Sequence, residues 1–91
     1  MRTIWKFPLK VTSEQIIEAP PPFNVLSVAE QGGILCLWAM VDPQGMKQQW
    51  RIIIKGTGHT FPTGEVTTEI FVGTVLTSGM ELVWHVFAKR A

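Results

Sequence analysis

Turn signals recur along this chain at a spacing of about 8–12 residues, which is typical of a small β-sandwich or barrel. A hairpin turn is predicted at Gln31–Gly33, and residues 42–45 (DPQG) form a second turn with proline at its second position. The prolines at 20–22 exclude a helix there, because proline lacks a backbone donor and restricts the residue before it. The chain is therefore expected to be all-β, a small antiparallel sandwich or barrel of about seven strands.

Runs rich in β-branched and aromatic residues lie between these turns and favour strands. One run, residues 66–76 (VTTEIFVGTVL), is ambiguous. Gly73 argues against a helix there, but a short helix over residues 66–70 stays an alternative. The expected strands are 3–10, 15–18, 24–30, 34–42, 47–55, 66–76 and 80–89.

A chain of 91 residues is expected to form a single domain, 1–91. Its composition is 46% hydrophobic and only 16% charged, against about 25% charged residues in typical soluble domains. Two predicted strands, ILCLWAMV (34–41) and LVWHVF (82–87), are apolar on both faces. So short a chain has little material to cover both faces of each strand, so one face is expected at a subunit contact in a homo-oligomer.

Several function classes are disfavoured by charge and cysteine content. The net charge is +1 and the basic residues are scattered, which argues against strong DNA binding. The single Cys36 excludes an intrachain disulfide and a cysteine-based zinc site. No signal peptide is apparent, and the longest apolar run, Ile34–Val41, is too short to span a membrane. A cytoplasmic protein is expected.

No catalytic constellation is apparent either. Asp42 is the only aspartate, and its place before proline favours a turn-stabilising side-chain bond. Cys36 lies in the middle of an apolar strand, where burial makes a thiol unreactive. We therefore expect no enzyme activity, no cofactor and no metal site.

The segment KGTGHTFPTGE, residues 55–65, is the strongest candidate for ligand binding. Consecutive amides in a glycine-rich turn can form an anion-binding nest, to which Lys55 and His59 add donors and charge. The segment lacks the ending of a P-loop and the helix of a dinucleotide fingerprint. The alternative is a plain turn in which glycine supplies positive φ and His59 is exposed.

Aromatic side chains provide a second element of a ligand site. Trp38 and Trp84 lie centrally in the two most apolar strands and are expected to be largely buried, but Trp38, Trp84 or Trp50 can also stack on a base. His85 lies between Trp84 and Val86. Its default role is structural, bonded to a backbone carbonyl, and ligand contact is the alternative.

Five blocks of the chain, RTIWKFPL, GGILCLWAMVDP, IIKGTGHTFP, FVGTVL and LVWHVFAKR, resemble a family of short uncharacterised proteins encoded by tailed phages and prophages. The resemblance covers most of the chain, and LWA-VDP, GTGH and VWHVF are its most distinctive parts. It implies a small accessory protein in a bacterial host cytosol, and such proteins often counter host antiviral defence.

The resulting hypothesis is a non-catalytic protein that binds and sequesters a small anionic nucleotide-derived signal. The alternatives are a protein–protein inhibitor that docks on a host defence effector or nuclease, and a phage structural or assembly protein. The predicted ligand-binding residues are Lys55, Gly56, Thr57, Gly58, His59, Trp38, Trp84 and His85.

Overall fold

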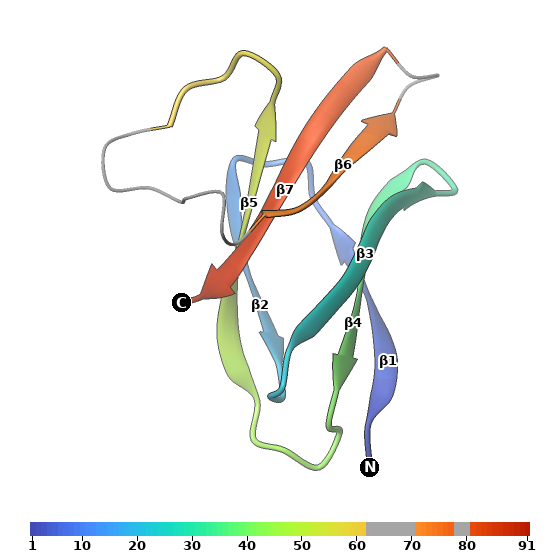
Figure 1. Cartoon of the computed structure of the whole chain (residues 1–91), viewed down its shortest axis with the longest axis vertical. Coiled ribbons are helices and arrows are strands. Elements are labelled where there is room, and N and C mark those ends of the chain that lie inside the picture. Colours follow the sequence, from blue (N-terminus) through green and yellow to red (C-terminus); the bar gives the residue numbers. More distant parts are fainter. Residues whose placement is uncertain (62–70, 78–80) are drawn as a thin grey trace.

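A computed structural model describes residues 1–61, 71–77 and 81–91 of the chain (Figure 1). All of the regular structure in these residues is β-strand. The strands are β1 (Thr3–Leu9), β2 (Glu14–Ala19), β3 (Asn24–Gln31), β4 (Ile34–Val41), β5 (Gln48–Gly56), β6 (Phe71–Thr77) and β7 (Leu82–Arg90).

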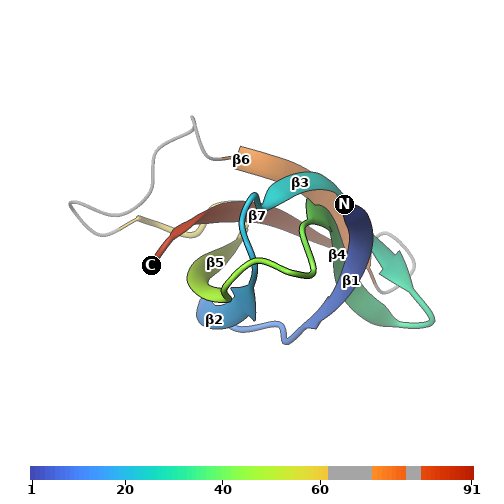
Figure 2. The same ribbon diagram turned by 90° about the horizontal axis from the view of Figure 1, so that it is seen from below.

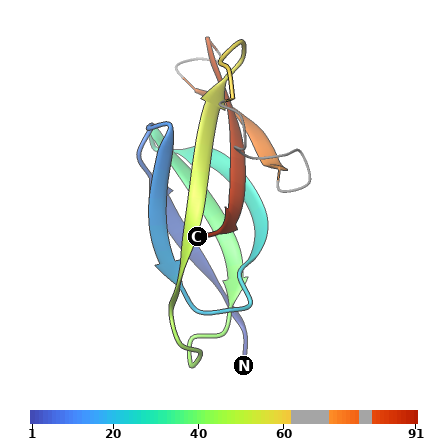
Figure 3. The ribbon, with the colours of Figure 1, turned by 90° about the vertical axis from the view of Figure 1, so that its left-hand side faces the viewer.

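The strands form two antiparallel sheets that pack face to face (Figure 3). The three-stranded sheet has the order β1-β4-β3 and the four-stranded sheet the order β2-β5-β7-β6. The expected small antiparallel all-β sandwich is therefore confirmed, and the strand boundaries agree closely with those predicted. Residues 71–76 of the predicted strand 66–76 belong to β6, and residues 66–70 lie outside the described residues. The alternative of a helix over residues 66–70 lies outside the described residues.

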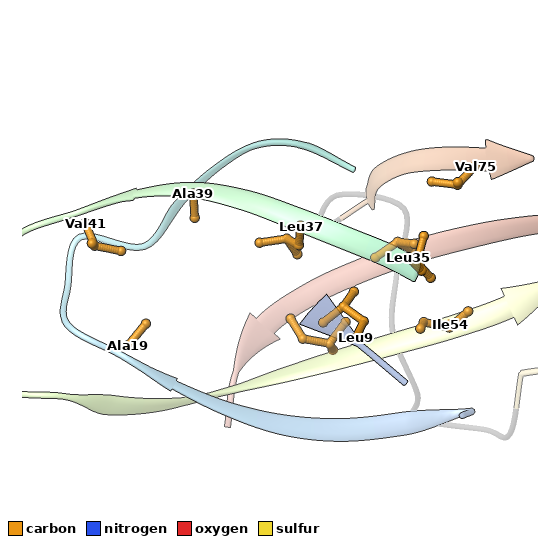
Figure 4. Packing of buried hydrophobic residues seen from close by; sticks show 10 residues of the cluster. Leu9, Ala19, Leu35, Leu37, Ala39, Val41, Ile54 and Val75 are labelled. Carbon is orange, nitrogen blue, oxygen red and sulfur yellow. The ribbon is translucent and has the colours of Figure 1, made fainter. Parts of the chain in front are cut away.

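Alternation along the strands builds the core between the sheets (Figure 4). The core-facing residues of β4 are Leu35, Leu37, Ala39 and Val41, and all four are buried. Across the interface, β5 contributes Ile52 and Ile54 and β7 contributes Val86. Aromatic side chains packed against this cluster supplement it, namely Trp5, Phe7, Phe23, Trp50 and Trp84.

The two predicted turns have the local geometry that their residues favour. Gly32 and Gly33 have φ values of 59° and 84°, so the hairpin between β3 and β4 depends on glycine. In the second turn the Gly45 amide donates to the Asp42 carbonyl oxygen (2.9 Å). The Gln44 amide donates to the Asp42 carboxylate (3.0 Å), as predicted for a turn-stabilising aspartate.

One side of the sandwich is closed where β3 and β6 lie side by side (Figure 2). The approach is close because Gly73 has no side chain; a Cβ there would lie 3.0 Å from Val28 Cγ2. Each of the two strands has a β-bulge, between Val25 and Ser27 in β3 and between Phe71 and Gly73 in β6.

Candidate functional site

The stretch Gly56-Thr57-Gly58-His59 forms a tight turn directly after β5. The His59 amide donates to the Gly56 carbonyl oxygen (3.0 Å), and Gly58 has φ of 91° at the third position. That combination is typical of a type II turn, which favours glycine at this position. Apart from the two chain neighbours of Gly58, no atom of the described residues lies within 4 Å of the place that a Cβ on Gly58 would occupy, so the tip of the turn is open on that side.

The His59 ring folds back over the backbone of its own turn. The Gly56 amide donates to His59 Nδ1 (3.0 Å). A Cβ on Gly56 would lie 2.9 Å from His59 Cε1, so the imidazole can lie there only because residue 56 is glycine. Since the Gly56 amide is already bonded, an anion-binding nest in this turn has to use the amides that follow it. The far side of the ring contacts Trp84 edge-on, with ring centroids 6.5 Å apart.

Lys55 holds the segment after the turn against the sheet. Its Nζ donates to the Thr60 carbonyl oxygen (3.2 Å) and lies 5.2 Å from the centroid of the Phe61 ring. Phe61 in turn packs edge-on against Phe87 of β7, with ring centroids 5.4 Å apart. Lys55, which was predicted to bind an anion, therefore also stabilises the position of residues 57–61.

His85 bridges two threonines on the solvent-facing side of the four-stranded sheet. Its Nε2 lies 2.8 Å from the Thr57 hydroxyl and its Nδ1 lies 3.0 Å from the Thr74 hydroxyl. A neutral imidazole has one donor and one acceptor nitrogen, so it accepts from one hydroxyl and donates to the other. His85 is thus half-buried and has a structural role, which was the first of the two roles considered for it. Its partners are hydroxyl groups, where a backbone carbonyl was expected.

Two cavities flank the contact between His59 and Trp84. One, of about 250 Å³, lies between Gly56 and Thr57 on one side and Glu81 and Leu82 on the other. The second, of about 230 Å³, is lined by the turn at residues 11–13 together with Ile54. Because His59 and Trp84 line both cavities, these two rings form a shared wall.

Of the eight predicted ligand-binding residues, the fold brings seven to one end of the sandwich. We call them the loop site; they are Lys55, Gly56, Thr57, Gly58, His59, Trp84 and His85. Trp38 is elsewhere. It lies in β4 of the other sheet, between the core residues Leu37 and Ala39, and its side chain therefore points to the outer face.

Trp38 and Trp84, which were predicted to be largely buried, both have intermediate burial in the structure. Trp38 belongs to the outer face, and Trp84 packs against the core near its end, where its indole Nε1 donates to the Thr77 hydroxyl (2.9 Å). The sequence placed both tryptophans in apolar strands, but it does not show which face of the strand each one occupies.

Three residues of this end were not anticipated. Thr74 and Thr77 are hydrogen-bond partners from β6, and Glu81 places a carboxylate beside the larger cavity. Their role depends on the pairing of β6 with β7, in which Thr74 lies opposite His85. The sequence offered no periodic signal for the two threonines, because Thr74 and Thr77 are three residues apart in β6.

Within residues 1–61, 71–77 and 81–91, no three His, Cys, Asp or Glu side chains are grouped so that they can hold a metal ion. No helix in that part of the chain has the length and apolar character needed to cross a bilayer.

Comparison with curated proteins finds no match, and neither does comparison with solved structures. A family model does match, over residues 1–91, and its description is a domain of unknown function, DUF7352. The chain therefore belongs to the DUF7352 family.

Proposed function

We propose that this protein is a non-catalytic binding module that holds a small anionic, nucleotide-like molecule at the loop site. The observation that carries the proposal is the shared wall of His59 and Trp84 with a cavity on each side. An aromatic ring and an imidazole at one cavity offer stacking and hydrogen bonding to the same ligand.

Further support comes from the open tip of the turn. Among the described residues, no atom beyond the two chain neighbours of Gly58 lies within 4 Å of its Cβ position, so a phosphate can approach the backbone from that side. Glu81 beside the larger cavity disfavours an anion at that position. The ligand's phosphate is therefore assigned to the side of Gly58 and Lys55, and its ring to the side of Trp84.

The resemblance to phage and prophage proteins gives the proposal a biological context. In a bacterial host cytosol, a protein of this kind lowers the free concentration of a nucleotide-derived signal and so counters antiviral defence. This role needs only tight, stoichiometric binding, and it uses no catalytic residue.

A second candidate function is docking on a host defence protein, favoured by the position of Trp38. A half-buried tryptophan on an outer sheet face, near the exposed Ile4, is typical of the aromatic anchors found in protein interfaces. Ile4 lies opposite Met40 in the neighbouring strand, so the apolar surface continues across the sheet.

Calorimetric titration with a panel of cyclic and linear nucleotides and ADP-ribose derivatives tests the first function. His59→Ala is expected to weaken binding about 10–150-fold, because it removes a hydrogen bond to a charged group. Lys47→Ala is the matched control, since Lys47 is an exposed cation before β5 at the other end of the strand. Absence of heat for the whole panel would favour the docking function instead.

A further inference from the structure

A groove at the opposite end of the sandwich has the features of a second binding site. It has a volume of about 310 Å³, at the lower limit for small-molecule pockets. We call it the aromatic groove; its lining includes Phe23, Val25, Trp50, Val72, Ala88 and Lys89. Trp84 and Lys89 are five residues apart in β7, or about 17 Å along the strand, so the groove and the loop site are separate.

The wall of the groove is a fixed aromatic surface. The rings of Phe23 and Trp50 are stacked, with centroids 4.8 Å apart and an interplanar angle of 24°. The Trp50 indole Nε1 donates to the Ala19 carbonyl oxygen (2.9 Å), and Phe7 packs edge-on against Phe23. Because these contacts hold both rings in place, a ligand does not have to order them, which lowers the entropic cost of binding.

The two β-bulges lie at the groove. The strands β3 and β6 approach closely at Gly73. The groove is lined by residues at the bulges, namely Val25 in β3 and Phe71 and Val72 in β6. Bulges bend a strand and are over-represented beside functional sites. The groove therefore forms at the bulges, where β3 and β6 separate after their close approach at Gly73.

The charge around the groove favours an anion. Lys89 contributes to the lining at the edge of β7, and it pairs with Arg51 on the outer face of the sheet, so two cations lie side by side at the mouth of the groove. The one ion pair in the described part of the chain joins Arg51 to Glu14 (3.7 Å), which leaves Lys89 without a carboxylate partner there. None of the described residues that line the groove is acidic, in contrast to the loop-site cavity beside Glu81.

From these observations we infer that the aromatic groove binds a small planar aromatic molecule with one anionic group. The ring packs against Phe23 and Trp50, and the anionic group lies near Lys89. The volume admits one or two fused rings, so the ligand class is an aryl carboxylate, sulfonate or phosphate of that size. The inference does not depend on the function proposed for the loop site.

Titration with 2-naphthoate and its neutral isostere 2-naphthamide, followed by amide NMR spectra, tests the inference. Naphthoate is expected to bind in the 0.1–1 mM range, on the order of what a ligand of its size achieves, and to shift the Ala88 and Lys89 amides. Lys89→Met keeps the aliphatic stem but removes the charge, so it is expected to weaken naphthoate binding about tenfold and leave naphthamide unchanged. Lys47→Met is the matched control, and it is expected to have no effect.

Three outcomes would overturn the inference. Equal binding of naphthoate and naphthamide would remove the role of Lys89. Shifts confined to the loop-site amides would move the ligand to the other end of the molecule. In a third titration, with an aromatic peptide, shifts at the groove amides that neither small molecule produces would indicate that the groove binds a protein. A parallel titration with adenosine monophosphate tests the loop site separately. Naphthoate is expected to shift the amides of the aromatic groove and adenosine monophosphate those of the loop site, so failure of one proposal can be distinguished from failure of the other.

Discussion

The outer faces of the two sheets are built from similar apolar strands, but their apolar side chains differ in how far other residues of the chain cover them. On the four-stranded sheet, Phe87 and Ile53 point away from the main core. Even so, the exposed fraction of Phe87 is 6% and that of Ile53 is 1%. Phe61 and Phe71 both pack edge-on against Phe87 at 5.4 Å. On the three-stranded sheet, Trp38 is half-buried and has no aromatic partner among the described residues.

The difference shows that a strand with two apolar faces does not by itself indicate a subunit contact. For β7, the chain covers the second face with its own residues after β5 and at the start of β6. For β4, the outer face carries Ile34 and Ile4 of the neighbouring strand at 50% and 54% exposure. A contact with a second copy or a partner is proposed for the outer face of the three-stranded sheet.

The largest expected effect is on stability, from Phe87→Ala. The substitution removes a buried ring held by two aromatic neighbours and is expected to cost about 3–5 kcal/mol of unfolding free energy. Trp38→Ala on the other face is expected to cost less, about 2–3 kcal/mol, because its side chain is only partly buried. Thermal melts of the two variants measure the contrast. Equal losses would mean that the two faces are not differently covered.

Assembly provides the second test. If the outer face of the three-stranded sheet joins two copies, Trp38→Glu is expected to weaken association by about 2–3 kcal/mol, or roughly 30–150-fold. Light scattering at micromolar concentration is then expected to show more than one chain for the wild type and a monomer for the variant. Leu76→Glu, an exposed position on the outer side of β6, is the matched control and should keep the assembled mass.

The cover of the four-stranded sheet is tested by Phe61→Ala. This removes an edge-on contact with Phe87 and the ring beneath the Lys55 ammonium, together worth about 1–2 kcal/mol. Chemical denaturation should show that loss with an almost unchanged denaturant dependence. A stability equal to the wild type would show that residues 57–61 do not hold the outer face.

The smallest effect is expected for Thr57→Val. The change removes the hydroxyl that lies 2.8 Å from His85 Nε2, and the expected cost is about 0.5–1.5 kcal/mol. Thr60→Val is a suitable control, because within the described residues the hydrogen bond of Thr60 is made by its backbone carbonyl, with Lys55. Urea titrations compare the two. A loss in both variants alike would assign the effect to the loop in general and not to the bridge by His85.

The local features of this protein could be derived from its sequence because each has a local physical cause. Glycines at 32–33 and 58 supply the positive φ that their turns need, and Asp42 bonds the backbone two residues ahead. Strand positions followed from β-branched and aromatic runs between these turns. The same local reasoning predicted a candidate turn at residues 55–59, but not the internal bonds that its polar groups make.

Only the tertiary structure decided which faces of the strands are covered and which side chains meet. Trp38 and Trp84 occupy equivalent places in apolar strands, yet one lies on an outer face and the other beside His59. The aromatic groove joins Phe23 and Trp50 with two bulges from strands far apart in the sequence. Such contacts depend on strand order and sheet packing, which arise from the balance of burial over the whole chain and leave no local signature in any one segment.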